Sequence, residues 1–267
     1  MGGNDMELNQ KIDTAAGLLA SARYSIALTG AGMSVESGIP PFRGPGGLWT
    51  KYGEPPMDGY QRFMKNPGDH WKERINPPPY RRELNETLER STPNPGHYAF
   101  AELESMGVLK FLITQNIDNL HIAAGSRNIA EIHGNYRLVR CIRCISRFPR
   151  EEVPLDEIPP LCPQCGHVLK GDTVMFGEPI PADVLDRCME EVGRSDCMIL
   201  AGTSATVQPA ASFPEMILRR GGSVIEVNLY ESPLTASCTV SLRGQTGKIL
   251  PLIVERLKQR IGDNRRH

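Results

Sequence analysis

Short apolar segments that resemble buried strands alternate with helical patterns along most of this chain of 267 residues. The strand-like segments are 25–32, 110–116, 128–134, 172–178, 197–204 and 223–229. The segments with apolar residues at helical spacing are 7–22, 97–106, 182–195, 213–222 and 248–261. This alternation is typical of strand–helix–strand units, so it predicts an α/β fold built on a doubly wound parallel sheet.

Two long stretches interrupt the alternation. Residues 41–95 are dense in proline and glycine with weak periodicity, which indicates helices and loops, and residues 136–171 carry four cysteines. We expect these insertions to form a smaller lobe beside the sheet. The predicted organisation is one domain over 7–267, with a large part from about 7–40, 96–135 and 172–260, a small lobe from 41–95 and 136–171, and a disordered tail at 261–267.

The four cysteines of the second insertion form two Cys-x-x-Cys pairs that are separated by 17 residues. They are Cys141, Cys144, Cys162 and Cys165. This spacing is typical of a tetrahedral zinc site of the structural kind, in which four thiolates leave no open position for water. Two disulfides or a redox pair are the alternative. The odd total of seven cysteines, without an export signal, favours a reducing compartment, so we expect a cytoplasmic protein with one bound zinc ion.

Bulk composition excludes some classes of partner. The formal net charge is −1, so no broad face for a polyanion is expected, and we predict no stable nucleic-acid partner. Nor does any apolar run approach the roughly 20 residues that a membrane span needs, so no membrane partner is expected.

The first strand-like segment ends in a glycine turn, Gly30-Ala31-Gly32. Such a turn leaves room for a phosphate to approach backbone N–H groups. Val35 occupies the place of the third glycine of the dinucleotide fingerprint, so a plain strand-to-helix connection is the alternative. The turn formers after it, together with Phe42 and Arg43, favour a ligand site.

Polar residues end the other strands as well. Gln115, Asn116 and Asp118 follow the second strand, where a helix cap would explain one of them. Further along the chain come Gly202, Thr203 and Ser204, and then Asn228. Since parallel strands end at the same edge of a sheet, this pattern predicts one ligand that crosses the edge.

His133 ends the third strand-like segment, beside these polar ends. A lone histidine is more often structural. Its position favours a neutral imidazole that acts as a general base.

Taken together, these blocks resemble the sirtuin family of NAD-dependent protein lysine deacylases. The resemblance covers Gly30 to about Leu252. It is carried by GAGMSVESGIPPFRG, TQNIDNLHIAAG, EIHGN, the four cysteines, DTVMFGEPIP, AGTSATVQPA and VIEVNL. It implies a Rossmann-like domain with a small zinc-binding and helical lobe, and NAD and an acyl-lysine protein or peptide as partners that enter from opposite sides.

The resemblance also implies roles for single residues. Cofactor contacts would come from Gly30, Ala31, Gly32, Ser34, Ile39, Phe42, Arg43, Gln115, Asn116, Ile117, Asp118, Gly202, Thr203, Ser204, Asn228, Leu229 and Thr246. The catalytic residues would be His133, Asn116 and Asp118, with His133 deprotonating a ribose hydroxyl after nicotinamide leaves. The products would be free lysine, nicotinamide and O-acyl-ADP-ribose.

Val174, Phe176, Gly177 and Glu178 would line one side of the peptide slot, so that the substrate adds as a strand. Two departures from the family pattern stand out. Pro41 replaces the Asp or Thr usual before the Phe-Arg pair, and Pro78 stands where sirtuins that prefer acidic acyl chains carry the tyrosine of Tyr-x-x-Arg, with Arg81 in the place of the arginine. We therefore expect acetyl groups to be preferred over succinyl. The alternatives are a mono-ADP-ribosyltransferase and a non-catalytic zinc-stabilised binding module.

Overall fold

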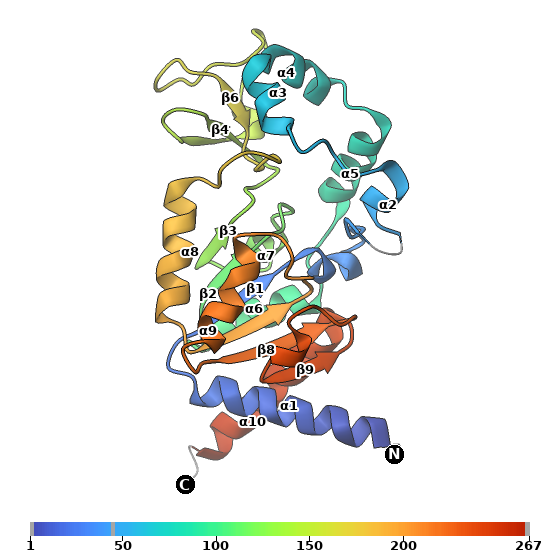
Figure 1. Cartoon of the computed structure of the whole chain (residues 1–267), viewed down its shortest axis with the longest axis vertical. Coiled ribbons are helices and arrows are strands. Elements are labelled where there is room, and N and C mark those ends of the chain that lie inside the picture. Colours follow the sequence, from blue (N-terminus) through green and yellow to red (C-terminus); the bar gives the residue numbers. More distant parts are fainter. Residues whose placement is uncertain (1–2, 44–45, 265–267) are drawn as a thin grey trace.

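The computed structural model describes residues 3–43 and 46–264, which form a six-stranded sheet with helices on both faces and a second, three-stranded sheet (Figure 1). The helices are α1 (Gly3–Ser21), α2 (Leu48–Tyr52), α3 (Gly59–Lys65), α4 (Pro67–Ile75), α5 (Pro79–Arg90), α6 (Pro95–Ser105), α7 (Leu120–Ala123), α8 (Ala182–Arg194), α9 (Phe213–Leu218) and α10 (Thr246–Asn264). The strands are β1 (Ser25–Thr29), β2 (Leu109–Thr114), β3 (Ile129–Glu131), β4 (Leu138–Cys141), β5 (Arg147–Pro149), β6 (Leu169–Gly171), β7 (Cys197–Ala201), β8 (Ser223–Asn228) and β9 (Val240–Arg243).

The large sheet is parallel throughout, in the order β3-β2-β1-β7-β8-β9. This confirms the predicted fold class. The order reverses direction between β1 and β7, and ligands of doubly wound sheets bind at the carboxyl end of such a switch point. The turns that begin at Gly30 and Gly202 follow these two strands, so the switch point lies between the two glycine-rich segments.

Alternate residues of the central strands β1, β2, β7 and β8 face opposite layers of helices, which explains why these strands are mainly apolar. One core contains Ala27, Leu112 and Ile199 with α1, α6 and α10. The other contains Ile26 and Met198 with α8 and α9. Because both faces of the central strands are covered, a ligand can reach the polar groups at the ends of these strands.

The two insertions lie against each other away from the large sheet (Figure 1). The first contains α2 to α5, in line with its helical prediction, and the second contains the antiparallel sheet β5-β4-β6. Trp71 of α4 packs on this sheet and its indole N–H donates to the Leu169 carbonyl at 2.7 Å. The residue boundaries of the two parts stay a prediction.

Two expectations were wrong in detail, and one strand was not predicted. Residues 172–178 form no strand, because the chain turns there, with Gly177 at φ 79°. β9 is an additional edge strand, in which buried Val240 and Leu242 alternate with more exposed polar residues. Helix α10 continues to Asn264, so residues 261–264 are not a disordered tail, and 265–267 lie outside the described residues. None of the helices within 3–43 and 46–264 has the length and apolar character that a membrane crossing requires.

Candidate active site

The two glycine turns at the switch point interlock. The Gly32 amide donates to the Gly202 carbonyl at 2.7 Å, and the Gly30 amide donates to Ala201 at 3.2 Å. A Cβ on Gly32 would lie 2.8 Å from the Gly202 oxygen, and one on Gly202, at φ 60°, would lie 2.3 Å from the Met33 nitrogen. These glycines are therefore needed because two backbones touch, and not only because a phosphate needs room, as their pattern suggested.

A buried polar cluster links the ends of β1 and β2. The Ser34 hydroxyl donates to Asp118 Oδ2 at 2.6 Å. Asn116 Nδ2 donates to Ser34 Oγ at 3.1 Å and to the Gly30 carbonyl at 3.0 Å. All three side chains are buried, so the structure brings these three predicted cofactor residues together.

Asp118 has two tasks in this cluster. Its Oδ1 accepts the Leu120 amide at 2.9 Å, so it does help to begin α7, as the capping alternative suggested. Burial raises the pKa of its carboxyl, while the hydrogen bonds from Ser34 and Leu120 act in the opposite direction. One carboxylate oxygen accepts the first amide of α7, and the other accepts the Ser34 hydroxyl.

Thr203, which follows β7, bonds to residues at the ends of β2 and β8. Its hydroxyl accepts from Gln115 Nε2 at 2.9 Å and from the Ala205 amide at 3.1 Å. Its carbonyl accepts from Asn228 Nδ2 at 2.8 Å. Ser204 and Leu229, the next residues on each loop, are exposed and thus accessible to a ligand. The polar residues that follow β2, β7 and β8 are therefore brought together, as the sequence predicted.

His133 lies just beyond β3, next to this edge. Its Nδ1 is 3.1 Å from the Gln115 carbonyl oxygen. Because a carbonyl only accepts, Nδ1 carries the proton, and Nε2 of the neutral ring is left with a lone pair. Burial lowers the pKa of His133 and the bond to Gln115 partly opposes this, so the ring is neutral at neutral pH. This is the state that a general base requires.

The segment after η2 (Val35–Ser37) brings an aromatic group to the site. Ile39 is buried, the Phe42 ring lies 5.2 Å from Trp49, and Trp49 lies 5.6 Å from Phe176. The Arg43 guanidinium stacks over Trp49 at 4.5 Å and pairs with Glu54 at 3.1 Å. Of the other predicted cofactor residues, Thr246 is buried at the start of α10, and its hydroxyl has no hydrogen-bond partner among the described residues. A ligand hydroxyl or phosphate oxygen would satisfy it.

The predicted peptide segment begins beside the histidine. The Val174 amide donates to the His133 carbonyl at 2.8 Å, and the Tyr60 amide of α3 donates to the Phe176 carbonyl at 3.1 Å. The Glu178 carboxylate is 4 % exposed and pairs with Arg140 and Lys170. Glu178 thus fixes this segment from inside and does not offer its carboxylate to a substrate.

The four predicted metal ligands come together. Their Sγ atoms all lie within 4.8 Å of one another, with Cys141 to Cys165 at 3.4 Å and Cys144 to Cys162 at 3.6 Å. Tetrahedral zinc with Zn–S bonds of about 2.3 Å would separate its sulfurs by about 3.8 Å, so the set fits zinc. All four are free thiols, which does not favour the disulfide alternative. The site is a candidate structural zinc centre on the sheet β5-β4-β6, away from the large sheet (Figure 1).

Sequence reasoning missed the charged residues that surround Glu178. Arg140 is adjacent to Cys141, and Lys170 and Asp172 follow the second cysteine pair. All three are buried. Their position beside the cysteines of a metal-binding segment could have indicated that they are buried. The sequence does not show which of them pair, because the pairing depends on the tertiary fold.

Comparison with known proteins identifies the family of this chain. The Sir2 family model matches residues 30–209. An NAD-dependent protein deacylase 1 of Archaeoglobus fulgidus is 48% identical over 243 residues, which is 90% of this chain and 96% of that protein. Among solved structures, a Sir2 homolog–NAD complex has a TM-score of 0.78 at 46% identity, covering 93% of this chain and 94% of the other.

A second solved structure holds products. It is a Sir2 histidine-to-alanine variant with a deacetylated p53 peptide and 3′-O-acetyl ADP-ribose, with a TM-score of 0.76 at 32% identity over 91% of this chain and 97% of the other. The matches extend over nearly the whole length of each protein. This chain belongs to the Sir2 family.

Proposed function

We propose that this protein is an NAD-dependent protein lysine deacylase that produces free lysine, nicotinamide and O-acyl-ADP-ribose. One observation carries the proposal: a neutral histidine lies at the same sheet edge as the buried Ser34–Asn116–Asp118 cluster, and its carbonyl is bonded to the segment proposed for the peptide. Relatives of similar length are named for this activity, and a related structure holds a deacetylated peptide with an acetylated ADP-ribose.

NAD, when bound, supplies an electrophilic ribose carbon and nicotinamide as a leaving group. The residues proposed to hold it are those of the two interlocked turns, the polar cluster and the neighbouring loops. They are Gly30, Ala31, Gly32, Ser34, Ile39, Phe42, Arg43, Gln115, Asn116, Ile117, Asp118, Gly202, Thr203, Ser204, Asn228, Leu229 and Thr246. Asn116 and Asp118 are restrained from several directions, so they can orient polar groups of a ligand without reorganising.

His133 is proposed to take a proton from a ribose hydroxyl at Nε2. The Gln115 carbonyl holds the other ring nitrogen as a donor, and it stabilises the imidazolium that forms when the proton arrives. Burial favours return to the neutral ring, so the base is regenerated once the proton leaves.

The acyl-lysine substrate is proposed to bind as an extended strand beside Val174, Phe176 and Gly177, and the segment after Asn228 would form the other side. Main-chain hydrogen bonds give such a mode its affinity and leave the substrate sequence largely free. The zinc ion would stabilise the sheet β5-β4-β6 and take no part in the chemistry. Location in the cytoplasm, and the absence of nucleic-acid and membrane partners, stay predictions from composition.

One assay separates this function from its alternatives. Purified protein is incubated with NAD and an acetyl-lysine peptide, and the masses of the peptide and of the small-molecule products are measured by mass spectrometry. A deacylase removes the acetyl group and forms nicotinamide and O-acetyl-ADP-ribose in equal amounts. A peptide that gains ADP-ribose would show an ADP-ribosyltransferase instead, and an unchanged peptide with unconsumed NAD would show a binding module.

A further inference from the structure

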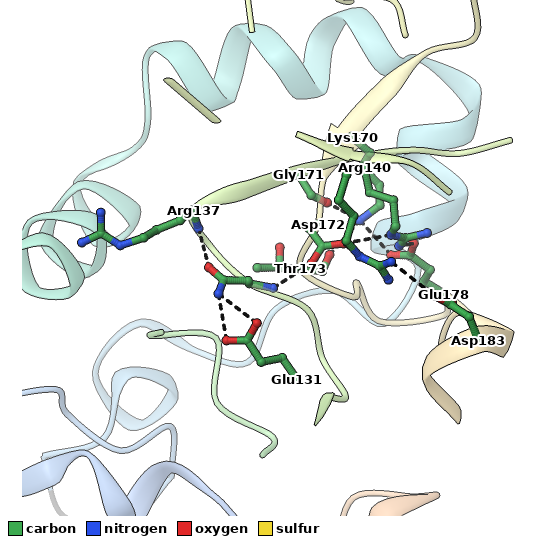
Figure 2. A network of polar contacts seen from close by, with 11 residues as sticks. Glu131, Arg137, Arg140, Lys170, Gly171, Asp172, Thr173, Glu178 and Asp183 are labelled. Atoms are coloured by element: carbon green, nitrogen blue, oxygen red, sulfur yellow. Dashed lines mark hydrogen bonds and ion pairs between the residues drawn. The ribbon is translucent and has the colours of Figure 1, made fainter. Parts of the chain in front are cut away.

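Five charged side chains meet between the zinc-binding sheet and the proposed peptide segment (Figure 2). The cations are Arg140 of β4, Arg147 of β5 and Lys170 of β6, and the anions are Asp172 and Glu178. The side chain of Lys170 is fully buried, those of Asp172 and Glu178 are 4 % exposed, and that of Arg140 is 7 % exposed. Because a buried charge without a partner is costly, each of these groups needs an oppositely charged partner in a defined geometry.

Arg140 lies at the centre of this network. Its Nε donates to Asp172 Oδ1 at 3.1 Å, and its Nη2 donates to Glu178 Oε1 at 2.7 Å. Of the cations in the described ranges, Arg140 alone pairs with both carboxylates, since Arg147 pairs with Asp172 and Lys170 with Glu178. A planar guanidinium can hold two carboxylates at a fixed separation, which an ammonium group cannot do.

Asp172 connects Arg140 to the loop that carries the histidine. Its Oδ2 accepts the Asn135 amide at 2.9 Å, two residues after His133. The two segments touch closely here, because a Cβ on Gly134, at φ 77°, would lie 2.2 Å from the Asp172 carbonyl oxygen. The position of Asp172 therefore restrains the backbone on the carboxyl side of His133.

Glu178 connects Arg140 to the proposed peptide segment. Its Oε2 accepts the Met175 amide at 2.8 Å, and its own amide donates to the Met175 carbonyl at 3.0 Å. Lys170 Nζ lies 3.0 Å from Oε2 and also donates to the carbonyls of Gly171 and Thr173 at 2.7 Å each. The turn at 175–178 is thus shaped by a carboxylate that Arg140 and Lys170 hold in place.

We infer that Arg140 is a positioning residue for deacylation, which sets the peptide-binding segment and the histidine loop relative to each other. This inference rests on the proposed function, because the proposed function assigns the peptide to residues 174–177 and the base to His133. Arg140 precedes the zinc ligand Cys141 directly, so the metal site fixes the start of this path. A zinc ion without a chemical role would in this way still affect catalysis.

The test compares Arg140→Lys and Arg140→Met with Arg143→Met, a control on the same zinc-binding segment whose exposed side chain, among the described residues, bonds to His167 and to neither Asp172 nor Glu178. For each protein we would measure zinc content, the melting temperature, and KM separately for NAD and for an acetyl-lysine peptide. Hydrogen exchange at the amides of Asn135, Val174 and Met175 reports the geometry directly, whether or not the protein deacylates a peptide.

For Arg140→Lys we expect zinc content and KM for NAD close to wild type, KM for the peptide raised by about tenfold, and faster exchange at the three amides. Arg140→Met should show the larger effect, and Arg143→Met none. If Arg140→Met fails to fold, Arg140→Lys decides. Unchanged peptide KM and unchanged exchange in Arg140→Lys would overturn the inference, and so would an equal rise in both KM values. A wild-type protein that removes no acyl group would instead refute the proposed function, and the exchange data would still decide whether Arg140 sets the two segments.

Discussion

Gly202 tests whether the two turns at the switch point interlock as described. Its φ of 60° costs an L-residue about 1–2 kcal/mol, and a Cβ there would lie 2.3 Å from the Met33 nitrogen and 2.6 Å from the Gly32 carbonyl carbon. Relief of such a backbone clash costs a further ~1–3 kcal/mol. We therefore expect Gly202→Ala to lower the free energy of unfolding by about 2–5 kcal/mol, or the melting temperature by about 4–20 °C.

Two other glycines distinguish the cost of a positive φ from the cost of the backbone clash. Gly221 has φ 78° with nothing within 4 Å of its Cβ position, so Gly221→Ala should lose only the conformational cost of about 1–2 kcal/mol. Gly193, in α8, has open space and no positive φ, so Gly193→Ala should be neutral or stabilise by about 0.5–1 kcal/mol. Calorimetry of the three variants, with and without NAD, would measure these differences. If Gly202→Ala melts no lower than Gly221→Ala, the close contact between the turns does not constrain the site.

Further predictions concern the metal, the acyl group and pH. Cys162→Ala should lose zinc, measured as metal per chain, and should lower the melting temperature and the activity together; a zinc-free protein that is folded and fully active would contradict the structural role. Acetyl-lysine should be preferred over succinyl-lysine, because Arg81 already pairs with Glu73 at 3.2 Å and Pro78 offers no hydroxyl; a tenfold preference in kcat/KM for succinyl, about 1.4 kcal/mol, would reverse this. Since burial lowers the pKa of His133 from its ordinary value of 6.5, the midpoint of the decline in deacylation rate at acid pH should lie below 6.5; a midpoint above 6.5 would be inconsistent with its environment.

Local patterns were enough to predict the sheet and the zinc ligands. The central strands β1, β2, β7 and β8 are covered on both faces, so each appears as a mainly apolar run, and metal ligands keep a short spacing along the chain. Segment 172–178 was assigned wrongly because Val174, Met175 and Phe176 look like a strand. The turn depends on Gly177 and on the hydrogen bond from the Met175 amide to the Glu178 carboxylate. That carboxylate is held by the buried cations Arg140 and Lys170, which no local pattern reveals.

The missed features have a common physical origin. β9 is short and lies at the edge of the sheet, so its alternating pattern is brief. Arg140 lies 32 and 38 positions before Asp172 and Glu178, so no local pattern shows that it pairs with them. The interlocked glycines were recognised, but the contact between turns that requires them involves residues about 170 positions apart.

The role of His133 at the edge of the sheet is the central claim, and His133→Ala tests it most directly. Peptide deacylation and nicotinamide exchange would be measured in the same preparation, with thermal stabilisation by NAD as the check on binding. We predict that deacylation falls by at least about a hundredfold while exchange and NAD binding persist, because the base acts after nicotinamide has left. Deacylation near the wild-type rate, or an equal loss of exchange and deacylation in a folded protein that still binds NAD, would contradict the account.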